Sequence, residues 1–181
     1  MTTFQLSRFS PEEPHLDGIA TVYARALNLD WTAEYPVLQF YSRMFGDFQG
    51  VAALVGDEVV GVGWGTRTQP GEWLYDRVAA QIGGDHPALQ NTWLLNILAV
   101  LERYRGLGIG TGLHNWQLAA QPCPRPLVCT DIDNQTARRF YKQLGWHALQ
   151  PDCTVQVGER QVIVLHKELH ASPLSDPRHQ L

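Results

Sequence analysis

The spacing of apolar residues predicts a strand followed by two helices over the first quarter of the chain. Phe4 and Leu6 alternate with polar residues from position 3 to position 7, which is the period of a half-buried strand. Residues 10–13 then read Ser-Pro-Glu-Glu, a capping box with proline at the first helical position. Two amphipathic helices are expected after it, with apolar stripes at Leu16, Ile19, Ala20, Tyr23 and Leu27 and at Val37, Leu38, Tyr41, Met44 and Phe45.

The middle of the chain changes to strand patterns. Valine-rich segments at 51–55 and 58–65 flank the turn signal Gly56-Asp57, so they predict a hairpin. Residues 69–91 are polar and contain proline and glycine, which indicates an insertion holding one helical piece marked by Trp73, Leu74, Val78 and Ile82. Residues 93–100 are almost continuously apolar, as in a central strand buried on both faces, and Asn96 is the one polar member.

The second half of the chain predicts an α/β crossover and a closing hairpin. A glycine-rich turn at 106–112 leads into a helix, and prolines interrupt the chain before a strand at 127–132. Asn134 can cap a further helix that ends at Gly145. The hairpin joins 154–157 to 161–169, and we expect residues 170–181 to be a disordered tail. The two helical stripes are Ile109, Leu113, Trp116 and Ala120, and Ala137, Phe140, Tyr141 and Leu144.

Composition narrows the class of protein. With 181 residues, 44% hydrophobic and 18% charged, the chain fits one globular domain, which we place at 1–169. The formal net charge is −4, and this argues against a nucleic-acid partner because binding to the phosphate backbone needs a basic footprint. We expect no signal peptide, membrane span or metal site, and three cysteines cannot form a complete disulfide framework. A cytoplasmic protein is the expectation.

The glycine-rich turn is the strongest candidate for a ligand site. Residues 105–112 read Arg-Gly-Leu-Gly-Ile-Gly-Thr-Gly between the most apolar strand and a helix, so backbone N–H groups at the helix start can approach an anion such as pyrophosphate. The alternative is a tight turn with no ligand. A dinucleotide fingerprint fails because Thr111 and Leu113 stand where glycine is needed, and a Walker phosphate loop fails because no lysine precedes Lys142.

Two motifs in this order resemble the GNAT superfamily of acetyltransferases. The segment 105–110 matches the pyrophosphate motif [QR]-x-x-G-x-[GA] of that family, and the strand Leu98-Ala99-Val100 precedes it as the family has it. Downstream, residues 134–146 resemble the family segment N-x-x-A-x-x-x-Y-x-x-x-G-[FW]. The resemblance is close over residues 93–149, and the order of elements on either side is also similar.

This resemblance implies an α/β fold with a central mixed, mostly antiparallel sheet, splayed open between parallel strands at 93–100 and 127–132 and flanked by helices. Acetyl-CoA would lie in the opening as cosubstrate. The implied contacts are the backbone of Leu98 and Val100 for the pantetheine, Asn134 for the pantetheine or as a helix cap, and Tyr141 for the sulfur. The expected cofactor-binding set is Leu98, Ala99, Val100, Arg105, Gly106, Leu107, Gly108, Ile109, Gly110, Thr111, Asn134 and Tyr141.

Acetyl transfer needs a neutral amine, donors for the oxyanion and a proton for the departing thiolate. Tyr141 can supply that proton, although the same side chain also fits an ordinary aromatic core position. Family members often place Glu or His on the central strand, and here Asn96 can only orient a water or the acceptor. The general base stays open between water and Glu34, Asp131 or Asp133.

The predicted function is therefore an acetyl-CoA-dependent N-acetyltransferase that acts on a primary amine of a small molecule or a protein. Two alternatives stand beside it. One is a non-catalytic acyl-CoA-binding module of the same fold, because the strand lacks a carboxylate. The other is a nucleotide-binding α/β protein, which the failed spacings disfavour. A homodimer is possible because the closing hairpin has an edge strand that could pair.

Overall fold

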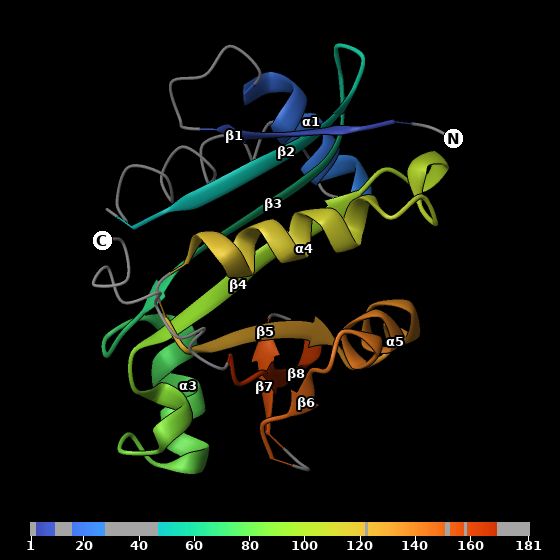
Figure 1. Cartoon of the computed structure of the whole chain (residues 1–181). Helices are drawn as coiled ribbons and strands as arrows, with labels where there is room; N and C mark the ends of the chain where they lie inside the picture. The colour runs from blue at the N-terminus through green and yellow to red at the C-terminus, as the bar shows by residue number, and fades with distance from the viewer. Residues whose placement is uncertain are drawn as a thin grey trace, which may run out of the picture. The chain divides into compact units, whose positions relative to one another are not determined.

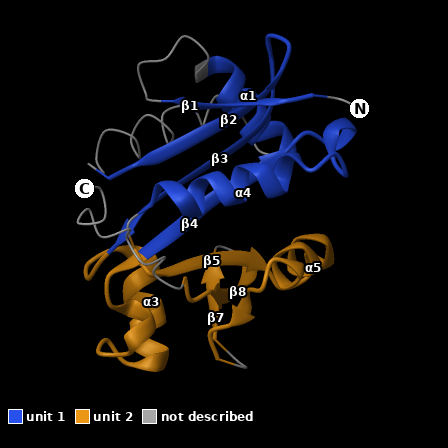
Figure 2. Ribbon diagram, in the orientation of Figure 1, with its two compact units in different colours: residues 1–68, 93–122 blue, residues 69–92, 123–181 orange. Residues whose placement is uncertain are grey.

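The elements follow the chain in nearly the order that the apolar spacing predicts (Figure 1). The computed structural model describes residues 3–9, 16–27, 47–121, 123–150, 153–157 and 159–169. They divide into two compact units, 1–68 with 93–122 and 69–92 with 123–181, shown in different colours in Figure 2. Each unit has its own strands and helices.

The first unit contains strands paired in the order β1-β2-β3-β4. β1 pairs antiparallel with β2, and β2 with β3. Val55 and Glu58 are strand partners, so Gly56-Asp57 is the predicted two-residue turn, with Gly56 at φ +60°. The elements are β1 (Gln5–Phe9), α1 (Leu16–Leu27), β2 (Gln49–Val55), β3 (Glu58–Thr68), β4 (Thr92–Val100), the 3-10 helix η2 (Glu102–Tyr104) and α4 (Ile109–Ala120).

The two helices of this unit bury apolar stripes against different clusters of strand side chains. α1 packs Ile19 and Tyr23 with Trp64 of β3, and the rings of Tyr23 and Trp64 meet edge to face at 4.9 Å. α4 packs Ile109 and Leu113 with Val51 of β2 and with Val60. Because adjacent strand residues point to opposite faces, these clusters define an α1 face and an α4 face of the sheet.

Glycines on β3 let α4 come close to the sheet. A Cβ added to Gly63 would lie 2.1 Å from the terminal amide of Gln117, and one added to Gly61 would lie 3.0 Å from Leu113. The Gln117 side chain is fully buried, and its amide bonds the backbone of Trp64, donating to the carbonyl at 3.3 Å and accepting from the N–H at 3.1 Å. The Gln117 side chain of α4 thus hydrogen-bonds the backbone of β3 from the face of the sheet that α4 covers.

The second unit also has an antiparallel sheet. β8 pairs on one edge with β5 and on the other with β6 and β7. α3 packs on β7, and Gln81 Nε2 donates to the Thr154 carbonyl at 2.6 Å. The elements are α3 (Trp73–Ile82), the 3-10 helix η1 (Pro87–Leu89), β5 (Arg125–Asp131), α5 (Gln135–Gln143), β6 (His147–Ala148), β7 (Thr154–Val157) and β8 (Arg160–His166).

The predicted mixed α/β class with mostly antiparallel pairing is confirmed. Strand β6 was not predicted, because two residues are too few to show a period. β4 was expected to be buried on both faces, and this is wrong in part, since residues 94, 96, 97, 98 and 100 are half-buried. Ile97, Leu98 and Val100 pack against the clusters under α1 and α4 as partly buried side chains, and only Ala99 of this stretch is buried in a cluster.

Other predictions concern parts that the structure does not describe or relations between the units. The capping box at 10–13, the second helix around 37–45, Glu34 and the tail at 170–181 lie outside the described residues. The opening between 93–100 and 127–132 concerns how the two units meet and stays a prediction, as does the single domain at 1–169.

Candidate functional site

The glycine loop begins at a firmly held end of β4. Leu101 N donates to the Val60 carbonyl at 2.9 Å, which ties the residue after β4 to β3. One turn of η2 follows, and Arg105 N donates to the Glu102 carbonyl at 3.1 Å. The start of the loop is therefore positioned by backbone hydrogen bonds.

Two glycines of the loop have backbone conformations that other residues avoid. Gly106 and Gly108 have φ of +78° and +83°, in the left-handed region where a Cβ costs about 1–2 kcal/mol. A Cβ built on either residue meets no atom of the described residues within 4 Å, in contrast to the crowded Gly63. The chain needs glycine here for its conformation, and the space beside the backbone is open.

The loop ends in the first turn of α4, where backbone donors are available. Gly108 is the N-cap and gives no side-chain cap, and the first helical hydrogen bond runs from Gly112 N to the Gly108 carbonyl at 2.9 Å. The N–H groups of residues 109–111 therefore have no helical partner. Together with the positive end of the helix dipole, they suit an anion such as pyrophosphate.

Side chains fix this loop on one side and leave it open on the other. Ile109 is buried in the cluster under α4, whereas Leu107 is 43% exposed. Arg105 Nε donates to the Val100 carbonyl at 3.2 Å, which holds the guanidinium beside the end of β4. The loop thus combines an anchored helix start with a positioned positive charge.

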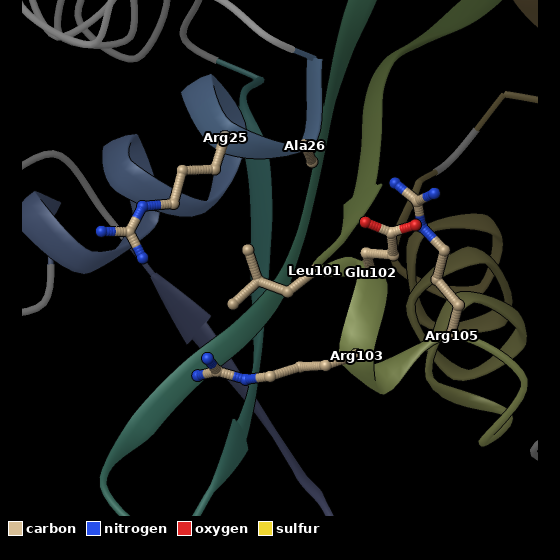
Figure 3. A pocket seen from close by; sticks show the side chains of 6 residues that line it. All are labelled: Arg25, Ala26, Leu101, Glu102, Arg103 and Arg105. Atoms are coloured by element: carbon tan, nitrogen blue, oxygen red, sulfur yellow. The ribbon is translucent and has the colours of Figure 1, made fainter.

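A cavity of about 540 Å³ adjoins the start of the loop (Figure 3). It is lined by the end of α1 and by the turn that follows β4. The lining residues are Arg25, Ala26, Leu101, Glu102, Arg103 and Arg105. This cavity could not be predicted from the sequence, because α1 and the turn are far apart along the chain.

The structure places Asn96 beside Thr66, a polar residue of β3. Its Nδ2 donates to Thr66 Oγ1 at 3.3 Å, so its side chain shares the face of Thr66 and Trp64, which is the α1 face. Ile97 also packs in the α1 cluster, so the alternation of side chains breaks at this point of β4. Asn96 Oδ1 is buried and has no hydrogen-bond partner in the described part of the chain, which leaves an acceptor for an N–H group of a ligand or water.

The three residues between Asn96 and the loop divide between the two faces. Leu98 and Val100 pack in the cluster under α4, and Ala99 is buried in the cluster under α1. Their proposed contact with pantetheine uses backbone groups and does not depend on which face their side chains occupy.

Asn134 and its neighbours form a capped helix start in the second unit. Asn134 Oδ1 accepts from Ala137 N at 3.0 Å, so of its two predicted roles the helix cap is confirmed. Asp131 Oδ1 accepts from Asp133 N at 3.0 Å, which gives the first of these carboxylates a structural task in the turn. Asp133 itself is exposed.

Tyr141 is held in an aromatic cluster of the same unit. It is 6% exposed, and its ring meets Phe140 at 5.3 Å and Trp146 at 5.7 Å, both edge to face. Burial raises the pKa of its phenol, and the thiol of Cys129 raises it further. The phenol therefore stays protonated at neutral pH, as a proton donor requires, and it is also well packed in the core.

Cys129 and Cys153 have raised thiol pKa values, which disfavours the reactive thiolate form. Burial raises the pKa of Cys129 to about 12, and Cys153 adds to the shift. Cys129 on β5 is the strand partner of Val164 on β8. The backbone N–H of Val164 donates a hydrogen bond to the carbonyl of Cys153. None of the three cysteines, all of which lie in the described part of the chain, forms a disulfide bond.

The first unit thus brings together Asn96, the end of β4, Arg105 and the glycine loop. Asn134 and Tyr141 belong to the second unit, so their approach to the loop stays a prediction. Two features escaped sequence reasoning altogether. Thr66 is the partner of Asn96, and His147 lies directly opposite His166 on β8. No spacing rule relates such cross-strand pairs.

Comparison with known proteins identifies the class. The sequence matches the acetyltransferase (GNAT) family over residues 16–146, and the chain belongs to this family. The family implies acyltransferase activity and the use of an acyl-CoA. A search of curated proteins found no match.

Solved structures share the fold at low sequence identity. An acetyltransferase from Streptococcus agalactiae has a TM-score of 0.68 at 16% identity, covering 93% of this chain and 100% of its own. Ribosomal-protein-alanine N-acetyltransferase from Brucella melitensis has a TM-score of 0.65 at 16% identity, covering 91% and 99%. Arabidopsis thaliana Naa50, solved with the bisubstrate analogue CoA-Ac-MVNAL, has a TM-score of 0.59 at 17% identity, covering 91% and 99%.

The described part of the chain contains neither a candidate metal-binding cluster nor a helix able to span a membrane. Among those residues, no group of histidine, cysteine and carboxylate side chains could hold a metal ion. No helix formed by them has the length and apolar character needed to span a membrane.

Proposed function

We propose that this protein transfers the acetyl group of acetyl-CoA to a primary amine of a small molecule or a protein. The observation that carries the proposal is the glycine loop, with two positive-φ glycines, open space beside them and Arg105 held at its start. Family membership supports the same reading. The cofactor-binding residues are those of the loop from Arg105 to Thr111, the backbone from Leu98 to Val100, and Asn134 and Tyr141.

The reaction is a direct attack of the amine on the thioester. The neutral nitrogen forms a C–N bond to the acetyl carbon, the C–S bond breaks, and the amine loses one proton. Tyr141 gives its phenolic proton to the departing thiolate and is reprotonated from solvent. Asn96 accepts an N–H of the incoming amine at Oδ1, because that buried oxygen has no partner among the residues that the structure describes.

Water is the proposed acceptor of the amine's proton as far as the described residues go, and Glu34, which lies outside them, and Asp133 stay alternatives. On the central strand Asn96 stands where a carboxylate could act, and Asp131 accepts a backbone hydrogen bond in its turn. A lysine-like amine has a pKa of about 10.4, so only a small fraction of it is neutral at pH 7. This small fraction limits the rate at neutral pH. The logarithm of kcat/KM is expected to rise with slope one from about pH 7 to 9.

The first experiment is calorimetric titration with acetyl-CoA and CoA, followed by a thiol-release assay on amines from acidic to polycationic. Gly108→Ala tests the loop, since a Cβ enters the open space in front of the backbone. We expect acetyl-CoA to bind at least tenfold more weakly. Gly56→Ala is the matched control, because Gly56 has φ +60° and equally open surroundings in the β2–β3 turn. Equal affinities in the two variants would contradict the loop assignment.

Tyr141→Phe tests the proton donor. The variant keeps the aromatic packing with Trp146 and removes the hydroxyl, so we expect a loss of about a hundredfold in kcat with an unchanged melting temperature. A loss below tenfold would remove Tyr141 from this role. Phe140→Leu, one residue earlier on α5, is the control for altered packing.

A non-catalytic acyl-CoA-binding module is the second candidate, favoured by the amide at position 96. Tight CoA binding without thiol release on any amine would support it. We further propose a cytoplasmic protein, a single domain at 1–169 and a possible homodimer through the edge of the closing hairpin.

A further inference from the structure

Thr66 and Asn96 lie on neighbouring strands whose backbones are closely packed. β3 and β4 are neighbours in the sheet, and a Cβ added to Gly65, next to Thr66, would lie 2.5 Å from the Leu94 carbonyl oxygen. Thr66 is only 2% exposed, and Thr68 lies two residues further on the same face of β3. A side-chain contact between these two strands therefore has little freedom to shift.

The hydrogen bond between these two side chains decides how the Asn96 carboxamide is turned. Its Nδ2 donates to Thr66 Oγ1 at 3.3 Å, and its Oδ1, at the other end, is buried and has no partner among the described residues. The two ends of a carboxamide are nearly equal in size and opposite in hydrogen-bonding character, so packing alone does not select one orientation. The reversed orientation would bury the two N–H bonds of Nδ2 instead, and a buried donor without a partner is rarer than such an acceptor. With Nδ2 bound to Thr66, the end that stays available is the oxygen.

We propose that Thr66 is a positioning residue, which keeps Oδ1 of Asn96 turned toward the reacting amine. The inference rests on the proposed function, because it takes Asn96 as the contact of that amine. A neutral amine has N–H groups and one lone pair, and the lone pair must attack the thioester. Oδ1 accepts an N–H and leaves the lone pair free, whereas Nδ2 in the same place would donate to the lone pair and prevent the attack. Thr66 thus selects the productive orientation through Asn96 and exchanges no proton with the amine.

The contact of the amine with Oδ1 strengthens as the reaction proceeds. When the C–N bond forms, the amine nitrogen becomes positive, and hydrogen bonds from charged donors are stronger than those between neutral groups. An interaction that is stronger in the transition state than in the bound substrate raises kcat and leaves KM nearly unchanged. Thr66→Val keeps the shape of the side chain and removes the hydroxyl. We expect it to lower kcat about tenfold, with unchanged KM values for acetyl-CoA and for the amine.

Two conservative variants separate positioning from packing. Thr66→Ser keeps the hydroxyl and loses a methyl group, so kcat should return to within about threefold of the wild-type value. Thr68→Val is the matched control, because Thr68 is 4% exposed on the same strand and its hydroxyl has no hydrogen-bond partner among the described residues. This control should keep the wild-type kcat, and an equal loss in Thr68→Val and Thr66→Val would overturn the proposal. Thermal melting checks that each variant folds.

A double-mutant cycle with Asn96→Ala tests whether Thr66 acts through the carboxamide. Without a carboxamide there is nothing to orient, so Thr66→Val should have no further effect on kcat in the Asn96→Ala background. If it lowers kcat about tenfold there as well, Thr66 acts on the substrate directly and the proposal is wrong. The proposal is also wrong if Thr66→Val changes only the KM for acetyl-CoA.

Nuclear magnetic resonance tests the positioning without any turnover. The Nδ2 proton signals of Asn96 are assigned by their loss from the ¹H–¹⁵N spectrum of Asn96→Asp. The hydrogen-bonded proton should exchange with water about tenfold more slowly in the wild-type protein than in Thr66→Val, and equal rates would overturn the inference. If no amine releases thiol, the proposed function fails instead, and this measurement still decides whether Thr66 holds the carboxamide.

Discussion

The close approach of α4 to β3 predicts that Gly63→Ala and Gln117→Ala are strongly coupled. A Cβ on residue 63 would lie 2.1 Å from the Gln117 amide, far inside contact distance, and Gln117 is fully buried. The amide must therefore leave its two hydrogen bonds with the backbone of Trp64. Each buried backbone group left without a partner costs about 1–3 kcal/mol.

The single substitutions should therefore have large and similar effects. Gly63→Ala is expected to lower the free energy of unfolding by about 2–4 kcal/mol, from displaced packing and the broken amide pairs. Gln117→Ala breaks the same two bonds and leaves a cavity, so about 2–5 kcal/mol is expected. In the double variant the methyl group enters space that the amide has vacated. Its cost should be close to that of Gln117→Ala alone, which gives a coupling free energy of about 2 kcal/mol or more.

Urea unfolding followed by circular dichroism measures the cycle. Gly61→Ala combined with Gln117→Ala is the control, because a Cβ on Gly61 meets Leu113 and Ile109 and does not meet the glutamine. That pair should be nearly additive. If the effects of Gly63→Ala and Gln117→Ala add to within about 0.5 kcal/mol, Gln117 does not occupy the space beside Gly63 and the packing argument is refuted.

Three further predictions concern the second unit. Cys129 should resist iodoacetamide at pH 8 in the folded protein and react after denaturation, because its pKa is raised to about 12, and mass spectrometry of the alkylated peptide checks this. Burial and the facing His147 and His86 lower the pKa of His166, against the opposing charge of Glu168. The unfolded chain then binds the proton more readily, so stability should fall as the pH drops below about 6.5, and His166→Gln should flatten this dependence in pH-resolved melts. Asn134→Ala should lower the free energy of unfolding by about 1 kcal/mol through loss of the helix cap, with Gln135→Ala as the neighbouring control, and an equal effect in both would remove the capping explanation.

Local chemistry explains why much of the fold could be predicted from the sequence. The turn at Gly56-Asp57, the cap at Asn134 and the helix after Gly108 each depend on residues that are neighbours in the chain. The apolar run at 93–100 indicated a strand for the same reason, since a period or a run is a local property. The glycine loop was identified as the candidate site because positive φ and an open backbone are set by glycine itself.

The rest depended on residues that meet across the sheet. Nothing in the sequence relates Gln117 to Gly63, Asn96 to Thr66 or Arg25 to Leu101, because each contact is set by strand register and by the packing of a helix on a particular face. The sequence by itself determined the elements, the family motifs and the residue types of the loop. Tertiary structure decided which face each side chain occupies, which polar atoms stay unpaired and where charge gathers, since these depend on distances between segments that the chain order does not constrain.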